Sequence, residues 1–241
     1  MRKTLSILLI AILVMSLVTT NVFGVEAIEG TKIKMHDVYV TVPYDESDID
    51  VVYEISDYEV IVTIKDAVTG KTLESHGEII PTLQEMPDEL LDELPIEIKN
   101  KALATRSNCE EVSPMAGGYF NKLIFERCEK EPVVARLYCD FEYFYESNHR
   151  NLISIIDTFW AEESSGSWKI ENEYSNARIV DPINLVVYGV AGIVITTTTE
   201  TTGEFSIDFL ESLGYSISHS SGSEYHAREI IDDFSYSYSL Y

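Results

Sequence analysis

The stretch VVARLYCDFEYFY at residues 133–145 decides the fold class. Apolar or small side chains occupy every second position, and mostly polar side chains lie between them. Successive side chains of a β-strand point to opposite faces, so this period of two predicts a long strand with one buried face. The buried set is Ala135, Leu137, Cys139, Phe141 and Tyr143, and the opposite set includes Arg136, Asp140 and Glu142.

The chain continues as strands after this stretch. Residues 152–162 and 168–174 are rich in β-branched and aromatic side chains, and the sequence SSGS at 164–167 lies between them. Two strands separated by such a turn predict a β-hairpin. Trp160 and Trp168 flank the turn, and we expect both to face the core.

The C-terminal part has strand patterns and one short helix. Residues 183–199 form a β-branched run in which Gly189 and Gly192 are candidate bulge positions. Residues 206–213 predict a short helix, and Gly214 is placed to end it. Further on, aromatic residues alternate with serine and predict a final strand.

The chain divides into three predicted regions. Residues 31–80 are rich in valine and isoleucine at alternate positions, and they predict an N-terminal β unit. Residues 81–105 place leucines at helical spacing between prolines and predict a helical connector. Residues 106–241 form the main antiparallel domain. The predicted fold is therefore mainly β, an antiparallel β-sandwich or meander with a short helical connector.

The N-terminal sequence predicts export. Two basic residues open the chain, an apolar run follows at 5–18, and Gly24 and Ala27 offer small-residue cleavage sites. This layout is typical of a secretory signal peptide, here residues 1–27. The apolar run is shorter than the roughly 20 residues that cross a bilayer. We expect a secreted or extracellular protein with no stable membrane span after cleavage; an uncleaved N-terminal anchor is the alternative.

The charge restricts the partners. The 241 residues include 41 acidic and 17 basic side chains, which gives a net charge of −24. Such a surface repels nucleic-acid phosphates, so we expect no nucleic-acid partner. It suits solubility, divalent cations or a basic partner. A hydrophobic content of 45% is typical of a folded chain rather than a disordered acidic tail.

Three cysteines lie close together in the sequence, at Cys109, Cys128 and Cys139. An exported chain can oxidise two of them, and three pairings are open. We expect a disulfide between Cys109 and Cys128. Cys139 lies on the apolar face of the central strand, so we expect a buried thiol there. Their spacing does not match a zinc site.

No local catalytic motif is present in the sequence: it lacks a GxSxG elbow, HExxH, a P-loop and a glycine-rich dinucleotide turn. The leading hypothesis is therefore a non-catalytic extracellular or cell-surface interaction protein with a protein or glycan ligand and no cofactor. A secreted hydrolase is an alternative, because carboxylates brought together by folding leave no local motif. Its candidate residues are Asp140, Glu142, Asp157 and Glu171.

An acidic loop follows the first strands. Asp45, Asp48 and Asp50 offer carboxylate oxygens, which Ca²⁺ prefers. The loop lacks the central glycine and the closing glutamate of an EF-hand, so the alternative is an ordinary solvated acidic turn.

The alternating aromatic residues near the C-terminus suggest another ligand site. Tyr236 and Tyr238 share one face of the final predicted strand. Exposed aromatic rows bind sugar rings, and a secreted carbohydrate-binding module is therefore a second alternative function. The competing interpretation is that this face belongs to the core.

Overall fold

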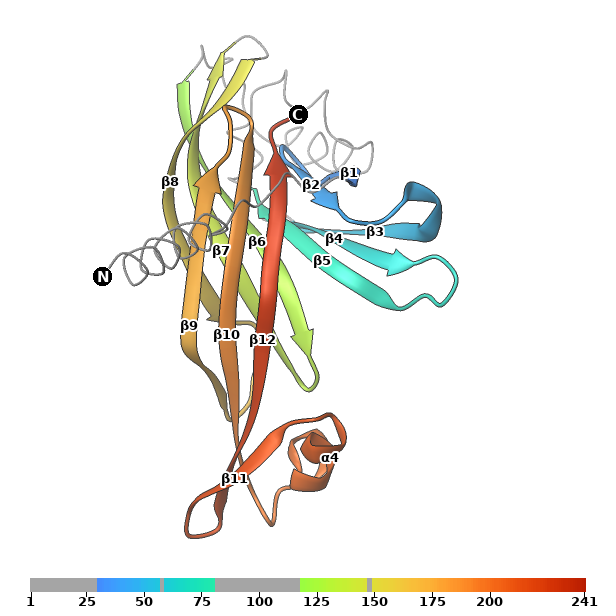
Figure 1. The fold of residues 1–241 in the computed structure, drawn as a ribbon, viewed down its shortest axis with the longest axis vertical. Helices are drawn as coiled ribbons and strands as arrows, with labels where there is room; N and C mark the ends of the chain where they lie inside the picture. Colours follow the sequence, from blue (N-terminus) through green and yellow to red (C-terminus); the bar gives the residue numbers. More distant parts are fainter. Residues whose placement is uncertain (1–29, 57–58, 81–117, 147–148) are drawn as a thin grey trace, which may run out of the picture.

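The computed structural model describes residues 30–56, 59–80, 118–146 and 149–241, which form two antiparallel β-sheets packed face to face (Figure 1). The predicted mainly β, antiparallel fold is confirmed. Sheet A contains β1 (Thr31–Lys34), β2 (Tyr39–Val42), β9 (Trp168–Ile179), β10 (Asn184–Thr198), β11 (Ser216–Ser221) and β12 (Glu224–Ser239). Sheet B contains β3 (Ile49–Ile55), β4 (Glu59–Asp66), β5 (Thr72–Ile79), β6 (Gly118–Lys130), β7 (Val133–Glu146) and β8 (His149–Glu162).

Strand β7 has the alternation that its sequence predicts. Every second residue from Val133 to Tyr145 is buried, and the residues between them are partly exposed. The strand pairs with β6 on one side and β8 on the other along most of its length. In sheet B the strands follow chain order from β3 to β8, a meander, whereas sheet A has the order β1-β2-β12-β10-β9, with β11 paired to β12.

The predicted hairpin between β8 and β9 is wrong. Both strands exist, and Trp160 and Trp168 are buried as expected. However, β8 lies in sheet B and β9 pairs with β10 in sheet A. The SSGS segment therefore carries the chain from one sheet to the other, which puts both tryptophans in the core between the sheets.

The strands of residues 31–80 are shared between the two sheets. β2 pairs with β12 at the edge of sheet A, and β5 pairs with β6 in sheet B. One hydrophobic cluster contains residues from Ile33 to Leu240, so the apolar faces of both predicted regions are buried together. The predicted division at residues 81–105 does not separate two cores, because each sheet contains strands that precede these residues and strands that follow them.

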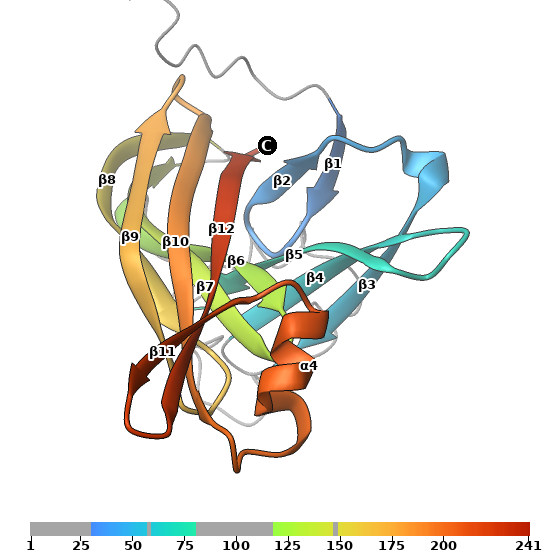
Figure 2. The ribbon, with the colours of Figure 1, turned by 60° about the horizontal axis from the view of Figure 1, so that its bottom comes forward.

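The segment between β10 and β12, residues 199–223, lies at the lower end of the molecule (Figures 1 and 2). A bulge interrupts β10 between Gly189 and Gly192, as predicted. The short helix α4 (Ile207–Ser212) follows the 3-10 turn η2 (Gly203–Phe205), and Gly214 takes a positive φ of 95° directly after it. Its Leu210 side chain is buried and anchors α4 on the core.

Three predictions lie outside the described residues. They are the signal peptide at 1–27, the helical connector at 81–105 and the Cys109 partner of the predicted disulfide. Within the described ranges, no helix is long and apolar enough to cross a membrane.

Candidate functional site

A row of polar side chains lines the inner face of sheet B. On β5, Glu74, His76 and Glu78 are two residues apart, so they share one face. On the neighbouring strand β6, Lys122 and Glu126 lie on the same inner face, and Glu126 is opposite His76 in the register. We call these five residues the polar row. Four of them are buried and Glu74 is partly exposed, which is unusual in a core and directs attention to this face.

One end of the polar row is closed by an ion-pair cluster. The Lys122 Nζ lies 2.6 Å from Asp37 Oδ2 and 2.7 Å from Glu78 Oε1. Burial opposes the charge of Lys122, but the two carboxylates outweigh it and raise the pKa of the ammonium. His36, Asp37 and Glu78 are the one group of possible metal-ligand atoms gathered within 4.8 Å in the described part of the chain. Lys122 already supplies the cation between the two carboxylates there.

Backbone groups fix the closed end. The turn between β1 and β2 points the N–H groups of His36, Asp37 and Val38 at Glu78 Oε2, at 3.1, 2.9 and 3.2 Å. The Arg150 guanidinium, from β8, donates to the Asp37 carbonyl at 2.9 Å. The turn of sheet A is thus held against sheet B by charge-assisted hydrogen bonds.

The other end of the polar row holds a neutral histidine. His76 Nε2 lies 3.1 Å from Glu74 Oε2, and Nδ1 lies 3.1 Å from the Tyr238 hydroxyl. Burial lowers the pKa of His76, although the hydrogen bond that its ring donates to Glu74 acts in the opposite direction. Because a carboxylate only accepts hydrogen bonds, we assign the proton to Nε2, and Nδ1 then accepts from Tyr238. Tyr236 packs on the same ring, with ring centroids 4.7 Å apart.

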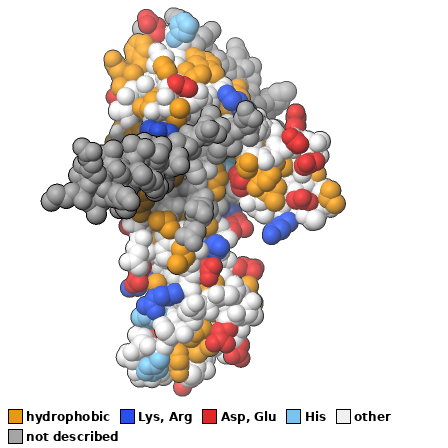
Figure 3. All heavy atoms as spheres, viewed as in Figure 1, with side chains coloured by type: hydrophobic (Ala, Val, Ile, Leu, Met, Phe, Trp, Pro, Cys, Tyr) orange, Lys and Arg blue, Asp and Glu red, His pale blue; other side chains and the backbone are white. Residues whose placement is uncertain are grey.

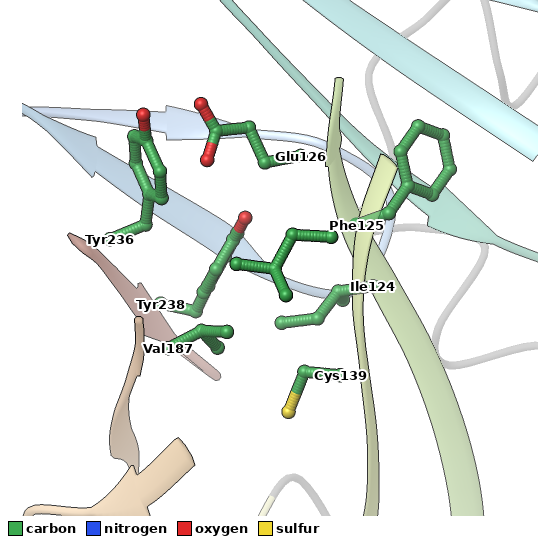
Figure 4. A pocket seen from close by; sticks show the side chains of 8 residues that line it. Ile124, Phe125, Glu126, Cys139, Val187, Tyr236 and Tyr238 are labelled. Atoms are coloured by element: carbon green, nitrogen blue, oxygen red, sulfur yellow. The ribbon is translucent and has the colours of Figure 1, made fainter. Parts of the chain in front are cut away.

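Glu126 is the unusual member of the row. It is 3% exposed, and its Oε2 has no hydrogen-bond partner. Burial raises its pKa well above the ordinary carboxyl value, and the negative charge of Glu74 raises it further. Figure 4 shows its carboxyl group pointing from β6 toward Tyr236 of sheet A. Burial, with Glu126 adding to it, raises the pKa of Tyr236 as well. In contrast to the carboxylates of the closed end, no positive charge among the described residues lowers the pKa of this carboxyl.

Glu126 lies between a dry crevice and an open pocket. The crevice, drawn in Figure 4, has about 160 Å³ of empty space and no room for a water molecule. The pocket has a volume of about 390 Å³. Its described lining is Lys71, Thr72, Leu73, Glu74, Ser75, Glu126, Arg127, Cys128, Glu129 and Glu131. The lining therefore contains four acidic and two basic side chains. One of the basic side chains, Arg127, already forms ion pairs with Glu129 and Glu163.

The predicted aromatic face belongs to the core. Tyr238 is 2% exposed and Tyr236 is half-buried against the hydrophobic cluster. Sheet B covers this face of β12, so the two rings cannot form the exposed sugar platform that the alternation suggested. Among the described aromatic residues, Tyr119 and Tyr174 are well exposed, at 66% and 53%.

The predicted calcium ligands lie on the surface. Asp45 precedes the 3-10 turn η1 (Glu46–Asp48), and Asp50 follows on β3. All three aspartates are exposed, and they are not part of the one group of gathered ligand atoms named above. Figure 3 shows acidic side chains on the β3–β5 projection, spread among hydrophobic and other side chains. These positions favour the alternative interpretation, an ordinary solvated acidic turn.

The four predicted catalytic carboxylates are partly brought together. Asp140 on β7 lies directly opposite Asp157 on β8. Partial burial and the charge of Asp157 raise the pKa of Asp140. Glu142 pairs with Ser154 in the same sheet, whereas Glu171 lies on β9 in sheet A.

Two of the cysteines are described. Cys128 and Cys139 are buried on the inner face of sheet B, and they form no disulfide with each other. Burial raises the pKa of Cys128 to about 11 and that of Cys139 to about 12. Cys139 is therefore the buried thiol that its position predicts. The pairing of Cys128 with Cys109 stays a prediction, because Cys109 is outside the described residues.

Sequence analysis missed the polar row, although a signal exists. Val60, Val62 and Ile64 on β4 are buried and lie in register with Glu78, His76 and Glu74 on β5. If β4 and β5 are paired as a hairpin, the polar residues of β5 lie on the same face of the sheet as the apolar residues of β4. That face is turned to the core. Recognising Glu126 requires the β5–β6 pairing, which joins residues some fifty positions apart.

The chain matches no protein-family model, no curated protein and no solved structure. The geometry of the described residues is therefore the basis of the functional argument.

Proposed function

We propose that this protein is an exported, non-catalytic binding protein, and that its pocket between β5 and β6 takes a cationic group of a basic protein partner. The observation that carries the proposal is the Glu126 carboxyl. It lines a pocket of about 390 Å³, is nearly inaccessible, and has one oxygen without a hydrogen-bond partner. The export part rests on the N-terminal sequence, residues 1–27.

A lysine ammonium or arginine guanidinium supplies what this carboxyl lacks. A buried polar atom without a partner is costly, and a charge-assisted hydrogen bond removes that cost. The cation also favours the ionised carboxylate, so its binding lowers the pKa of Glu126 and releases a proton. Glu74, Glu129 and Glu131 around the same pocket add negative charge. The net charge of −24 speeds the approach of a basic partner.

A titration with Nα-acetyl-lysine amide tests the pocket. We expect chemical-shift changes at Glu126, Cys128 and Ser75 in the protein NMR spectrum at pH 8, and no such changes with neutral Nα-acetyl-norleucine amide. Glu126→Gln should weaken binding about tenfold or more, because the variant loses a hydrogen bond between charged groups, which contributes at least that factor to the affinity. Glu200→Gln, at an exposed turn outside the pocket lining, is the matched control. Equal shifts with both amides, or equal binding by both variants, would refute the proposal.

A carboxylate-dependent hydrolase is a second candidate, supported by the Asp140–Asp157 pair. The raised pKa of Asp140 is what a general acid needs, and Asp157 is its cross-strand neighbour. Release of reducing sugar from a panel of polysaccharides would be lost in Asp157→Asn and kept in Glu171→Gln. No release by the wild type from any member of the panel removes this candidate.

A further inference from the structure

The ion-pair cluster at the closed end of the polar row has the parts of an amide-forming site. Lys122 on β6 of sheet B is 2% exposed, and its Nζ lies 2.6 Å from Oδ2 of Asp37, in the β1–β2 turn of sheet A. The second carboxylate, Glu78 on β5, lies 2.7 Å from the same Nζ and is fully buried. An amine and a carboxyl are thus in contact across the two sheets, with little access to water.

The two carboxylates are held differently. Glu78 Oε2 accepts three backbone N–H groups, while its Oε1 contacts Lys122. Asp37 Oδ2 contacts Lys122, but Oδ1 is buried and has no hydrogen-bond partner. Glu78 is therefore fixed as a base that can carry protons beside the amine. Asp37 has an oxygen that no protein group holds, as a departing oxygen requires.

We propose that Lys122 and Asp37 become joined by an amide bond between Nζ and the side-chain carbonyl carbon, with Glu78 as the proton carrier. The proposal does not depend on the function of the Glu126 pocket. Reactants held in contact and away from water need no co-reactant for this condensation.

The condensation converts the ion pair into an amide and one water. The Lys122 ammonium transfers a proton through Glu78 to Asp37, which gives a neutral amine and a carboxylic acid. The ion pair is the resting form, because each group holds the other charged, and burial of both groups is the factor that opposes those charges. The amine attacks the Asp37 carbonyl carbon, Glu78 takes a proton from the nitrogen and delivers it to the hydroxyl, and the C–O bond breaks. One water leaves, Glu78 is regenerated and nothing is oxidised or reduced.

Denaturing mass spectrometry of the purified full chain tests the bond. We expect the wild type to be about 18 Da, the mass of one water, lighter than the mass calculated from the residues that the purified chain retains. Digestion should yield one branched species that joins the peptides containing Asp37 and Lys122, with no tryptic cleavage after Lys122. This mass measurement on the wild type does not require any variant to fold.

Variants assign the roles. Lys122→Arg and Asp37→Ala should have full mass, and Glu78→Gln should have full mass while its circular dichroism remains that of a folded β protein. Lys130→Arg, which changes a lysine on the same strand outside the cluster, should keep the deficit. A wild type of full mass, or a deficit that maps to other residues, would overturn the proposal. A deficit retained in Glu78→Gln would overturn the role of Glu78.

Discussion

Replacing Glu126 by glutamine should change how the stability of the protein depends on pH, so that the wild type loses stability relative to the variant as the pH rises. Glutamine has nearly the shape of the carboxylic acid and cannot ionise. In the folded protein, burial and Glu74 raise the pKa of Glu126 well above its ordinary value. In the unfolded chain the same carboxyl has an ordinary pKa. The folded state therefore holds a proton that the unfolded state loses as the pH rises.

The sign and size follow from this difference in proton binding. Because the folded pKa is raised, the contribution of Glu126 to stability is complete below the ordinary carboxyl pKa and is lost as pH rises toward the folded pKa. The loss is about 1.4 kcal/mol per pH unit within that window. The wild type should thus fall behind Glu126→Gln by about that amount for each unit, starting from about pH 4.5.

Urea unfolding of the wild type and Glu126→Gln at half-unit steps from pH 4 to pH 8 measures this difference. A constant cost of the buried amide shifts all points equally, so the slope of the difference carries the test. Glu200→Gln, which removes one acidic side chain at an exposed turn, is the matched control. If the difference in unfolding free energy between the wild type and Glu126→Gln stays constant from pH 4 to pH 8, folding does not raise the pKa of Glu126.

Three further predictions test other parts of the structure. Gly77→Ala should cost about 1–3 kcal/mol in urea unfolding, because the new Cβ would lie 2.1 Å from the Phe125 ring; unchanged stability would contradict this packing. In a Cys109→Ser variant, Cys128 and Cys139 should react with a disulfide reagent only after the protein is unfolded, because both thiols are buried and have raised pKa values. Fast labelling of the native variant would contradict their burial. Calcium at roughly millimolar concentration should leave the melting temperature unchanged, because the aspartates of the 45–50 loop are exposed and not gathered; an increase would make that loop a calcium site.

The strands themselves could be predicted from the sequence because alternation is local. The period of two in β7 and the Gly-ended helix α4 depend on neighbours a few residues away, and both are observed. The assignment of strands to sheets is not local. The SSGS segment after Trp160 has the composition of a hairpin turn, but the chain changes sheet there, and the apolar faces on both sides are buried in one core.

The candidate site could not be predicted for the same reason. Glu126 acquires its environment from β5, through pairing with His76, and from Tyr236 and Tyr238 of sheet A. The sequence spacing of these residues is large, and none belongs to a local motif. The alternation around Tyr238 correctly indicates a face with aromatic side chains, but only the packing of the two sheets decides that this face is inside.

Whether a cation changes the protonation of Glu126 can be measured directly. We would label glutamate side chains with ¹³C and follow the Glu126 carboxyl resonance by NMR from pH 4 to pH 9, with and without Nα-acetyl-lysine amide. We expect the titration midpoint of Glu126 to be well above that of an ordinary carboxyl in the free protein and to be lower with the amide present. An ordinary midpoint in the free protein, or one that the amide does not move, would contradict it.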